Sequence, residues 1–531
     1  MKKTRKILSL LLALAMMVSM LSVTAFADTM DNDHDRISVA SGEYTTLVWD
    51  ATDYHKGTIT AVSDTYYPNT MVFYVDNGTI SGVTATALAG VEGAYQLTLP
   101  ATAGSFTVTL ADYNHGNGVY TIYYSAPSGT KPTPGATAYA YLPAPGQFTN
   151  EGVTNGGWGD IYDASGAKKS NSTTGVSLGY FGGYVVYQFN TPVYNTSTNP
   201  YGADFIVYGN AFWNNSEPGC IQVSQDGATW YDIAGSRYYN STTTKNASIT
   251  YTNPNVSQDA GFTAAASNLG TPANVSYSGT ASGTISTNTF HNHNWFPLKV
   301  NYFTGRYGNA EMSKIDSLPF ASRTLSSGVA GTLTLSGVLL SGVTTNNTAG
   351  YGFGYCDVHP NKTLGGTVAY NPYQTFTSSS DYNTKTAGTS GGDPIDIAWA
   401  VDGDGKPVDL GSIQYVRIYT GAAMMNGIFG EVSTEVCGVA ACSGSTTETT
   451  ATPTITVAGT VQTTKNGKMT TLSKMGGNSV TVNVSGSGYI YINGTAQTSA
   501  SFTPTNAGTI VQVIIQNGEA APYITWLCLK K

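Results

Sequence analysis

Short runs of alternating apolar and polar residues dominate the chain, and they predict β-strands rather than helices. The clearest run covers residues 221–224, where the apolar side chains face one side and the polar ones the other. Asp226-Gly227 follows, a pair typical of tight hairpin turns because glycine tolerates a positive φ. The apolar face then resumes at Trp230 and Ile233. This stretch predicts a β-hairpin with one buried face.

A second strand with the same alternation lies far downstream, at residues 413–419, and we expect it to pair with the hairpin in one sheet. An extended segment at 204–208 precedes the hairpin, and a loop carrying Asn210, Trp213 and Glu217 joins the two. Helical periodicity is scarce along the chain. The pattern predicts a central antiparallel β-sandwich whose loops carry the function.

Further strand-like runs separated by turns fill residues 37–124 and 480–515. Two segments rich in Pro, Gly, Ser and Thr separate them from the centre and predict linkers. We therefore expect an all-β fold of three β-sandwich modules, a large jelly-roll-like one flanked by small immunoglobulin-like ones. The expected boundaries are a signal peptide (1–27), an N-terminal sandwich (28–124), a linker (125–135), the central binding domain (136–442), a linker (443–453) and a C-terminal sandwich (454–531).

The first residues predict secretion from a bacterium. A basic segment at 2–6 precedes an apolar segment at 7–23, and Ala25-Phe26-Ala27 has the form of a cleavage site. The mature chain is then expected to begin near Asp28. No later run reaches the ~18 apolar residues that a membrane-spanning helix needs. We expect an extracellular protein without a transmembrane segment, associated with the cell envelope.

The composition agrees with an extracellular location. Charged residues make up 11% of the chain, against ~25% in an average soluble domain. The formal net charge is −8, which argues against nucleic acid as a partner because phosphate binding needs clustered Lys and Arg. Five cysteines are too few for a disulfide framework.

Four of the cysteines carry specific expectations. Cys437 and Cys442 are spaced so that a disulfide between them would close a short loop. Cys220 begins a predicted strand, which favours a small buried side chain. Cys356 has His359 three residues on, a pairing that suggests thiolate chemistry, although burial is the favoured interpretation.

Ordered sequence blocks in the central domain point to known proteins. The hairpin and the late strand resemble the galactose-binding-like jelly rolls, which include many carbohydrate-binding modules. Six blocks together resemble a family of poorly characterised cell-surface proteins of gut bacteria. The blocks are YLPAPGQF (141–148), SLGYFGG (177–183), DFIVYGNAF (204–212), SEPG (216–219), WYDIAGS (230–236) and GEVSTE (430–435). The resemblance implies a surface location and ligand binding rather than a known reaction, and some such proteins are linked to corrinoid uptake.

Four aspartates in the segment GGDPIDIAWAVDGDGKP are candidate calcium ligands. Asp393, Asp396, Asp402 and Asp404 supply hard oxygen atoms between glycine turns, the ligand type that Ca²⁺ prefers. The closing glutamate of an EF-hand loop is missing. The alternative is a solvated hairpin turn at 402–405.

A further candidate site is the segment FHNHNW at 290–295. His291 and His293 share one face of an extended chain, a spacing found in zinc and copper sites, whereas the alternative is a polar loop packed on Trp295. Trp158, Trp213 and Trp295 occur in loop contexts, where indole rings can stack on sugars; the alternative is that they pack in the hydrophobic core. The residues expected to bind ligand are therefore Asn210, Trp213, Glu217, His291, His293 and Trp295.

Taken together, the sequence favours a secreted, non-catalytic protein that binds a glycan or another small polar ligand through the central loops. One alternative is a glycoside hydrolase, which needs two carboxylates about 5–10 Å apart; Glu217, Glu431 and Glu435 are its candidates. A corrinoid capture protein would need a broad apolar pocket. A structural or adhesive role needs no binding site.

Overall fold

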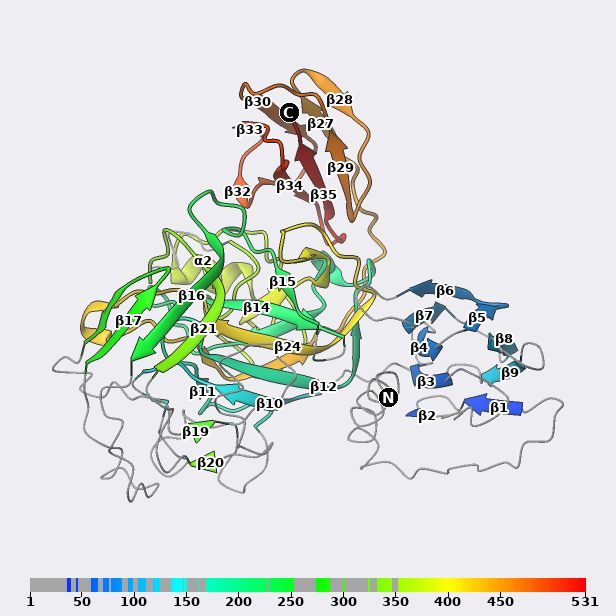
Figure 1. The fold of residues 1–531 in the computed structure, drawn as a ribbon, viewed down its shortest axis with the longest axis horizontal. Helices are drawn as coiled ribbons and strands as arrows, with labels where there is room; N and C mark the ends of the chain where they lie inside the picture. Colours follow the sequence, from blue (N-terminus) through cyan, green and yellow to red (C-terminus); the bar gives the residue numbers. More distant parts are fainter. Residues whose placement is uncertain are drawn as a thin grey trace. The chain divides into compact units, whose positions relative to one another are not determined.

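The structure is a computed structural model. It describes separate strands between residues 36 and 124, and then residues 135–146, 148–149, 161, 169–225, 227, 229–252, 274–286, 299–300, 323–324, 332–345 and 352–531. The chain forms two compact units, Met1–Pro132 and Thr133–Lys531. The fold is all-β, as expected, and its strands form many small, mostly antiparallel sheets (Figure 1). In the described ranges, no helix is both long and apolar enough to cross a membrane.

The first unit contains two sheets, with strand orders β1-β9-β8-β5 and β2-β3-β4-β7-β6. Leu97, Phe106 and Val108 are buried. The strands are β1 (Arg36–Val39), β2 (Tyr44–Thr45), β3 (Ile59–Asp64), β4 (Thr70–Val75), β5 (Gly78–Ser81), β6 (Thr84–Ala87), β7 (Ala94–Thr98), β8 (Gly104–Leu110) and β9 (Gly118–Tyr124).

The second unit begins with the central domain, which is built on a six-stranded sheet in the order β10-β12-β24-β14-β15-β23. Smaller sheets β22-β13-β26, β11-β25 and β18-β17-β16-β21 accompany it, together with the pair β19-β20. The strands are β10 (Ala136–Leu142), β11 (Val176–Ser177), β12 (Tyr184–Tyr194), β13 (Phe205–Tyr208), β14 (Gly219–Ser224), β15 (Tyr231–Ile233), β16 (Thr244–Thr252), β17 (Val275–Gly279), β18 (Gly283–Ile285), β19 (Lys299–Val300), β20 (Arg323–Thr324), β21 (Thr332–Leu339), β22 (Asp393–Ile395), β23 (Ala400–Val401), β24 (Ser412–Thr420), β25 (Glu435–Val436) and β26 (Gly438–Ala441). The helical elements are α2 (Ser379–Lys385) and the 3₁₀ turns η2 (Pro200–Gly202), η6 (Ile397–Trp399) and η7 (Gly427–Phe429).

The hairpin and the late strand meet as the sequence predicts. Strands β14 and β15 form the hairpin, and Gly227 in its turn has φ +70°. Strand β14 pairs antiparallel with β24, so that Ile221 lies opposite Ile418 and Val223 opposite Val416. The central sheet is thus assembled from strands nearly two hundred residues apart in the sequence.

The expectation of a single buried face is too simple for this sheet. Eight of the nine residues of β24 are buried, because neighbouring sheets cover both faces. Its tyrosines place their rings in the core and their hydroxyl groups on polar partners; Tyr419, for example, accepts a hydrogen bond from the backbone N–H of Val338 at 2.9 Å. The guanidinium of Arg417 lies 4.1 Å from the centroid of the Tyr184 ring. Aromatic residues therefore replace much of the aliphatic core usual in such sandwiches.

The C-terminal module is a second sandwich, with sheets β28-β27-β30-β33 and β29-β35-β34-β31-β32. Its core is aliphatic and includes Ile455, Val482, Val513 and Leu527. The strands are β27 (Thr454–Val457), β28 (Thr460–Gln462), β29 (Lys468–Leu472), β30 (Val480–Ser485), β31 (Tyr489–Ile492), β32 (Thr495–Ala496), β33 (Ser499–Phe502), β34 (Thr509–Gln516) and β35 (Tyr523–Leu529).

Hydrogen bonds join this module directly to the central domain, so the two are not connected by a flexible linker alone. The indole N–H of Trp526 donates to the hydroxyl of Tyr239 at 2.8 Å. The segment at 443–453, expected to be a linker, makes hydrogen bonds to both sides: Thr446 N–H donates to Thr198, and the hydroxyl of Thr450 donates to Ala521.

The suggested disulfide between Cys437 and Cys442 is wrong, because all five cysteines are free. The two residues lie at opposite ends of β26, and five residues of extended chain separate them by roughly 16 Å. A disulfide needs Cα atoms within about 7 Å. Cys220 is buried, as expected, and so is Cys356, where burial raises the pKa of the thiol well above its usual value. That thiol is not poised as a thiolate.

Candidate functional site

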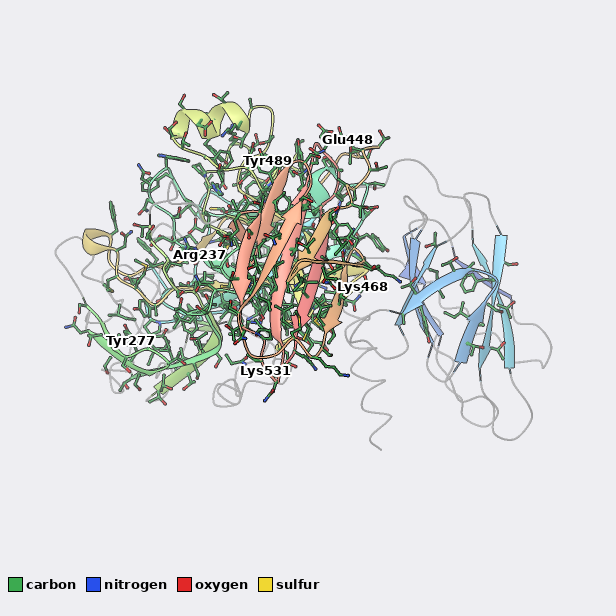
Figure 2. All side chains as sticks on the ribbon, turned by 90° about the horizontal axis from the view of Figure 1, so that it is seen from above. Arg237, Tyr277, Glu448, Lys468, Tyr489 and Lys531 are labelled. Atoms are coloured by element: carbon green, nitrogen blue, oxygen red, sulfur yellow. The ribbon has the colours of Figure 1, made fainter. Side chains whose placement is uncertain are left out.

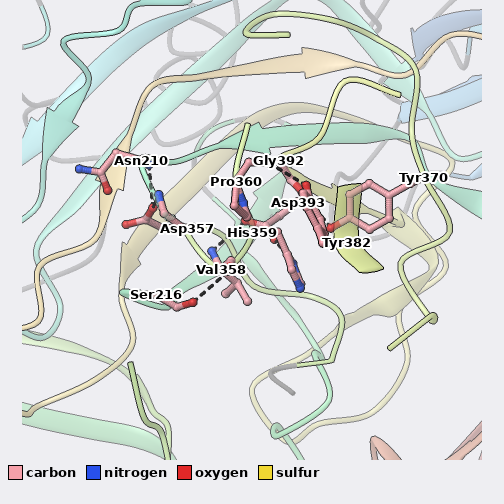
Figure 3. Close-up of polar contacts among 11 residues, drawn as sticks. Asn210, Ser216, Asp357, Val358, His359, Pro360, Tyr370, Tyr382, Gly392 and Asp393 are labelled. Carbon is pink, nitrogen blue, oxygen red and sulfur yellow. Dashed lines mark hydrogen bonds and ion pairs between the residues drawn. The ribbon is translucent and has the colours of Figure 1, made fainter. Parts of the chain in front are cut away.

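A buried aspartate fastens the loop after β13 to the rest of the central domain. The Oδ1 atom of Asp357 accepts hydrogen bonds from the backbone N–H groups of Asn210 and Ala211, each at 2.7 Å (Figure 3). Its Oδ2 atom accepts a third from the backbone N–H of Glu435 at 3.0 Å. Gly209 permits this approach, since a Cβ atom there would lie 2.2 Å from Asp357 Oδ1. The carboxylate therefore fixes the loop against β25.

Asp357 belongs to a group of three carboxylates that the fold brings together, which we call the acid cluster. Glu217, Asp357 and Glu435 each place an oxygen atom within 4.8 Å of the others. Glu217 lies just before β14, and Glu435 begins β25. Asp357 and Glu435 are buried, whereas Glu217 as a residue is partly exposed.

Hydrogen-bond donors are distributed unequally within the acid cluster. Asp357 accepts three backbone N–H groups. Glu435 accepts the hydroxyls of Ser177 at 2.9 Å and Ser433 at 3.0 Å. Glu217 receives only the backbone N–H of Ser433, at 3.3 Å, in addition to its contact with Glu435. Hydrogen-bond donors stabilise the ionised form of a carboxyl group. Asp357 and Glu435 have more donors and therefore ionise more readily, whereas a proton shared within the cluster is held by Glu217.

Burial and mutual repulsion raise the proton affinity of the whole cluster. Burial, followed by the charge of Glu435, raises the pKa of Glu217 well above its usual range. The same two causes raise the pKa of Asp357. Burial raises the pKa of Glu435 to about 7, although its bonds to Glu217 and to the two serines oppose the rise. Three carboxylates this close either share protons or hold a cation.

The acid cluster is also the group in the described residues that has the donor set for a metal ion. Three carboxylate oxygens suit a hard divalent cation such as Ca²⁺ or Mg²⁺. The carboxylates are already fixed by backbone and serine donors. A cation there would take the place of the shared proton.

Two short turns stand beside the acid cluster. In the first, Phe212 and Asn215 exchange backbone hydrogen bonds, and Asn214 adopts φ +69° at the tip. In the second, η7 lies between Met425 and Glu431, which form an isolated bridge. The first turn precedes Glu217 and the second precedes Glu435, so both lead directly into the cluster.

These turns are joined to each other and expose aromatic rings, and we call them the paired turns. The side-chain amide of Asn426 donates to the side-chain oxygen of Asn215 at 3.0 Å. The residue after the first turn, Ser216, is anchored by its backbone N–H, which donates to the backbone carbonyl of Thr345 at 2.8 Å. Phe212 is 56% exposed and Phe429 is 51% exposed, values unusual for phenylalanine. Each turn therefore offers solvent a phenyl ring beside asparagine amides.

Three of the residues expected to bind ligand lie in this region. Asn210 is exposed, and its side chain hydrogen-bonds to Glu435. Glu217 is a member of the acid cluster. Trp213 is only partly exposed and packs on an aromatic cluster, with its ring 6.2 Å from that of Tyr382. His291, His293 and Trp295 lie outside the described residues.

The four aspartates expected to bind calcium have separate partners. Asp393 is buried and contacts the Nδ1 atom of His359 at 2.9 Å (Figure 3), and Asp396 accepts the backbone N–H of Ala398 at 2.7 Å. Asp402 accepts backbone N–H groups within its own turn, and Asp404 pairs with Lys406 at 2.7 Å. Calcium binding by these residues stays a prediction.

His359 lies in an aromatic environment rather than beside a nucleophile. Its ring stacks on Tyr382, with centroids 5.7 Å apart and planes 5° apart, and meets Phe376 edge to face. Asp393 also accepts the backbone N–H of Val358 at 3.0 Å. The pair of His359 and Asp393 thus braces the segment that carries Asp357.

Sequence reasoning missed three important residues of this site. Asp357 was overlooked because its neighbours Cys356 and His359 suggested thiol chemistry instead. The exposed rings of Phe212 and Phe429 were missed because phenylalanine in an apolar block is ordinarily a core residue. Glu431, by contrast, was a candidate but is buried beside Gly146, outside the acid cluster. In comparisons with known proteins, no family model and no curated protein matches the chain.

Proposed function

We propose that this protein is a secreted, non-catalytic binding protein that recognises a glycan through the paired turns of its central domain. The observation that carries the proposal is the display of Phe212 and Phe429 beside asparagine amides. Aromatic rings cover the apolar faces of sugars, and amide groups bond to their hydroxyls. The bond between Asn215 and Asn426 holds the two turns in place before a ligand arrives, which lowers the entropic cost of binding.

The acid cluster supports this proposal as a structural base. Its buried members, Asp357 and Glu435, accept hydrogen bonds from backbone N–H groups and from serine hydroxyls. These bonds fix the ends of both turns. A glycan would meet Asn210 and the partly exposed Glu217 at the edge of the cluster. Binding then needs no chemical step.

The test is a glycan-binding screen of the full chain, followed by titration calorimetry with the tightest ligand. Aromatic residues at the centre of a binding site typically contribute more than 1 kcal/mol. We expect Phe212→Ala and Phe429→Ala each to weaken binding by about tenfold. Val461→Ala is the matched control, since Val461 is an exposed apolar residue of the C-terminal module. Unchanged affinity in both phenylalanine variants would refute the proposal.

One observation favours glycoside hydrolysis as a second candidate. Glu217 and Glu435 are adjacent acids with raised pKa values, the combination that an acid catalyst and its partner require. The burial of Glu435 opposes this role, because a sugar has to reach both carboxyl groups. Incubating the screened glycans with the wild-type chain and with Glu217→Gln distinguishes the two: products formed only by the wild type would establish the hydrolase. Cobamides in the same screen test corrinoid capture.

A further inference from the structure

A cavity of about 180 Å³ lies where the C-terminal module meets the central domain. It is smaller than the roughly 300–1,000 Å³ pockets that take drug-sized ligands, and fits a molecule of about ten non-hydrogen atoms. Lys468, labelled in Figure 2, belongs to its lining. Its lining includes Gly202, Asp396 and Ala398 of the central domain and Asn466, Lys468 and Trp526 of the C-terminal module.

The lining changes from buried to exposed across the cavity. Asp396, at 2% exposure, lies on the buried side together with Gly202 and Trp526. A Cβ atom on Gly202 would lie 2.6 Å from Asp396 Oδ2, so the glycine leaves room for that oxygen atom. Ser197 and Asn466 are exposed and supply polar groups on the opposite side.

The lining contains one acid that is not paired with a basic side chain. Asp409 and Lys468 pair with each other at 2.7 Å, which makes Asp396 the remaining ionisable residue of the lining. Asp396 accepts a single backbone N–H, from Ala398. Behind it lies a second acid, Asp204, which bonds to Asn199 at 2.7 Å. Burial and the charge of Asp204 raise the pKa of Asp396 well above its usual range.

We propose that this cavity binds a small primary ammonium compound, about the size of one amino sugar, with its ammonium group against Asp396. A cation at this point replaces the proton that burial and Asp204 otherwise keep on Asp396. Trp526 adds an aromatic wall able to attract the same cation, and its indole is held by the bond to Tyr239. The polar groups of Ser197 and Asn466 suit the hydroxyls of such a ligand.

The experiment compares glucosamine with N-acetylglucosamine and glucose, which have nearly the same ring but no ammonium group. Titration calorimetry on the full chain is expected to show glucosamine binding at least tenfold tighter than either neutral sugar. Asp396→Asn keeps the shape and the acceptor for Ala398, and is expected to remove this preference. Asp404→Asn, in an exposed turn, is the control and is expected to bind as the wild type does.

A second variant keeps the test decisive if Asp396→Asn fails to fold. Ala398→Leu enlarges a lining side chain but leaves the carboxylate and its backbone donor in place, and is expected to block glucosamine. Equal binding of glucosamine and N-acetylglucosamine, binding that survives both variants, or no binding of glucosamine at millimolar concentration would each overturn the proposal. Its outcome is separate from that of the paired turns, because Phe212→Ala and Phe429→Ala leave this cavity untouched.

Discussion

Replacing Glu217 by glutamine changes how the stability of the protein depends on pH. Raised pKa values mean that the folded state keeps a proton that the unfolded state releases. Stability gained from this proton is therefore fully present below the unfolded pKa, near 4.5, and is lost as the pH rises through the folded value. For Glu435 the folded pKa is about 7. We expect the wild-type chain to lose stability between pH 5 and pH 8.

The magnitude follows from the size of the shift. A rise from 4.5 to about 7 corresponds to about 3 kcal/mol, an upper bound because the three acids of the cluster share their protons. The glutamine amide in Glu217→Gln donates permanently to Glu435, as the protonated acid does. Burial still raises the pKa of Glu435 in the variant, so the variant keeps that contribution and loses only the contribution of Glu217. It should therefore match the wild type at pH 5 and lose less stability than the wild type by pH 8, by about 1.4 kcal/mol for each pH unit by which the pKa of Glu217 is raised.

The assay is urea unfolding of both proteins at several pH values between 5 and 8, in the presence of EDTA. Asp404→Asn is the control: pairing with Lys406 lowers the pKa of this exposed acid, so its stability curve should parallel the wild type in this range. Parallel curves for Glu217→Gln and the wild type would refute proton sharing. A wild type that is strongly stabilised by Ca²⁺ at pH 8, with the effect lost in the variant, would show that the acid cluster holds a cation instead.

Three further outcomes follow from the packing. Gly209→Ala places a methyl group 2.2 Å from Asp357 Oδ1 and should cost about 1–3 kcal/mol in urea unfolding, while Gly403→Ala, with open space around it, should cost little; equal effects would contradict the close approach. Gln512→Leu should raise the melting temperature, because Gln512 is fully buried and neither of its amide atoms has a hydrogen-bond partner; a lower melting temperature would mean that the amide is satisfied. Thiol labelling followed by peptide mapping should leave Cys220 and Cys356 unmodified in the folded chain, since burial raises the pKa of both thiols, and rapid labelling would contradict this.

Local alternation predicted the hairpin of β14 and β15 and its partner β24, because the period of two and the Asp-Gly turn are encoded within a few residues. The approach of Glu217 to Asp357 and Glu435 joins segments separated by more than a hundred residues, and no local pattern encodes it. The four aspartates predicted to bind calcium, whose role stays a prediction, show how neighbours in sequence can separate in the fold. Asp393, Asp396, Asp402 and Asp404 are close in sequence, yet a strand, a 3₁₀ turn and a hairpin turn carry them to different partners.

Asparagine and phenylalanine illustrate a second limit of sequence reasoning. The exposure of Asn210 was predictable because a polar side chain in a loop is usually exposed; its binding role stays a prediction. The phenyl rings of Phe212 and Phe429 lie in tight turns that are joined by the bond between Asn215 and Asn426, and no local sequence pattern predicts that these rings are exposed.

The most direct test of the binding proposal measures whether a glycan binds to the protein and is then released unchanged. The tightest glycan from the screen is incubated with the chain at stoichiometric concentration, and mass spectrometry measures the bound and the released sugar. We predict saturable binding, recovery of the glycan intact, and loss of binding in the double variant Phe212→Ala/Phe429→Ala. Recovery of shortened sugars, or full binding by the double variant, would contradict a passive receptor built on the paired turns.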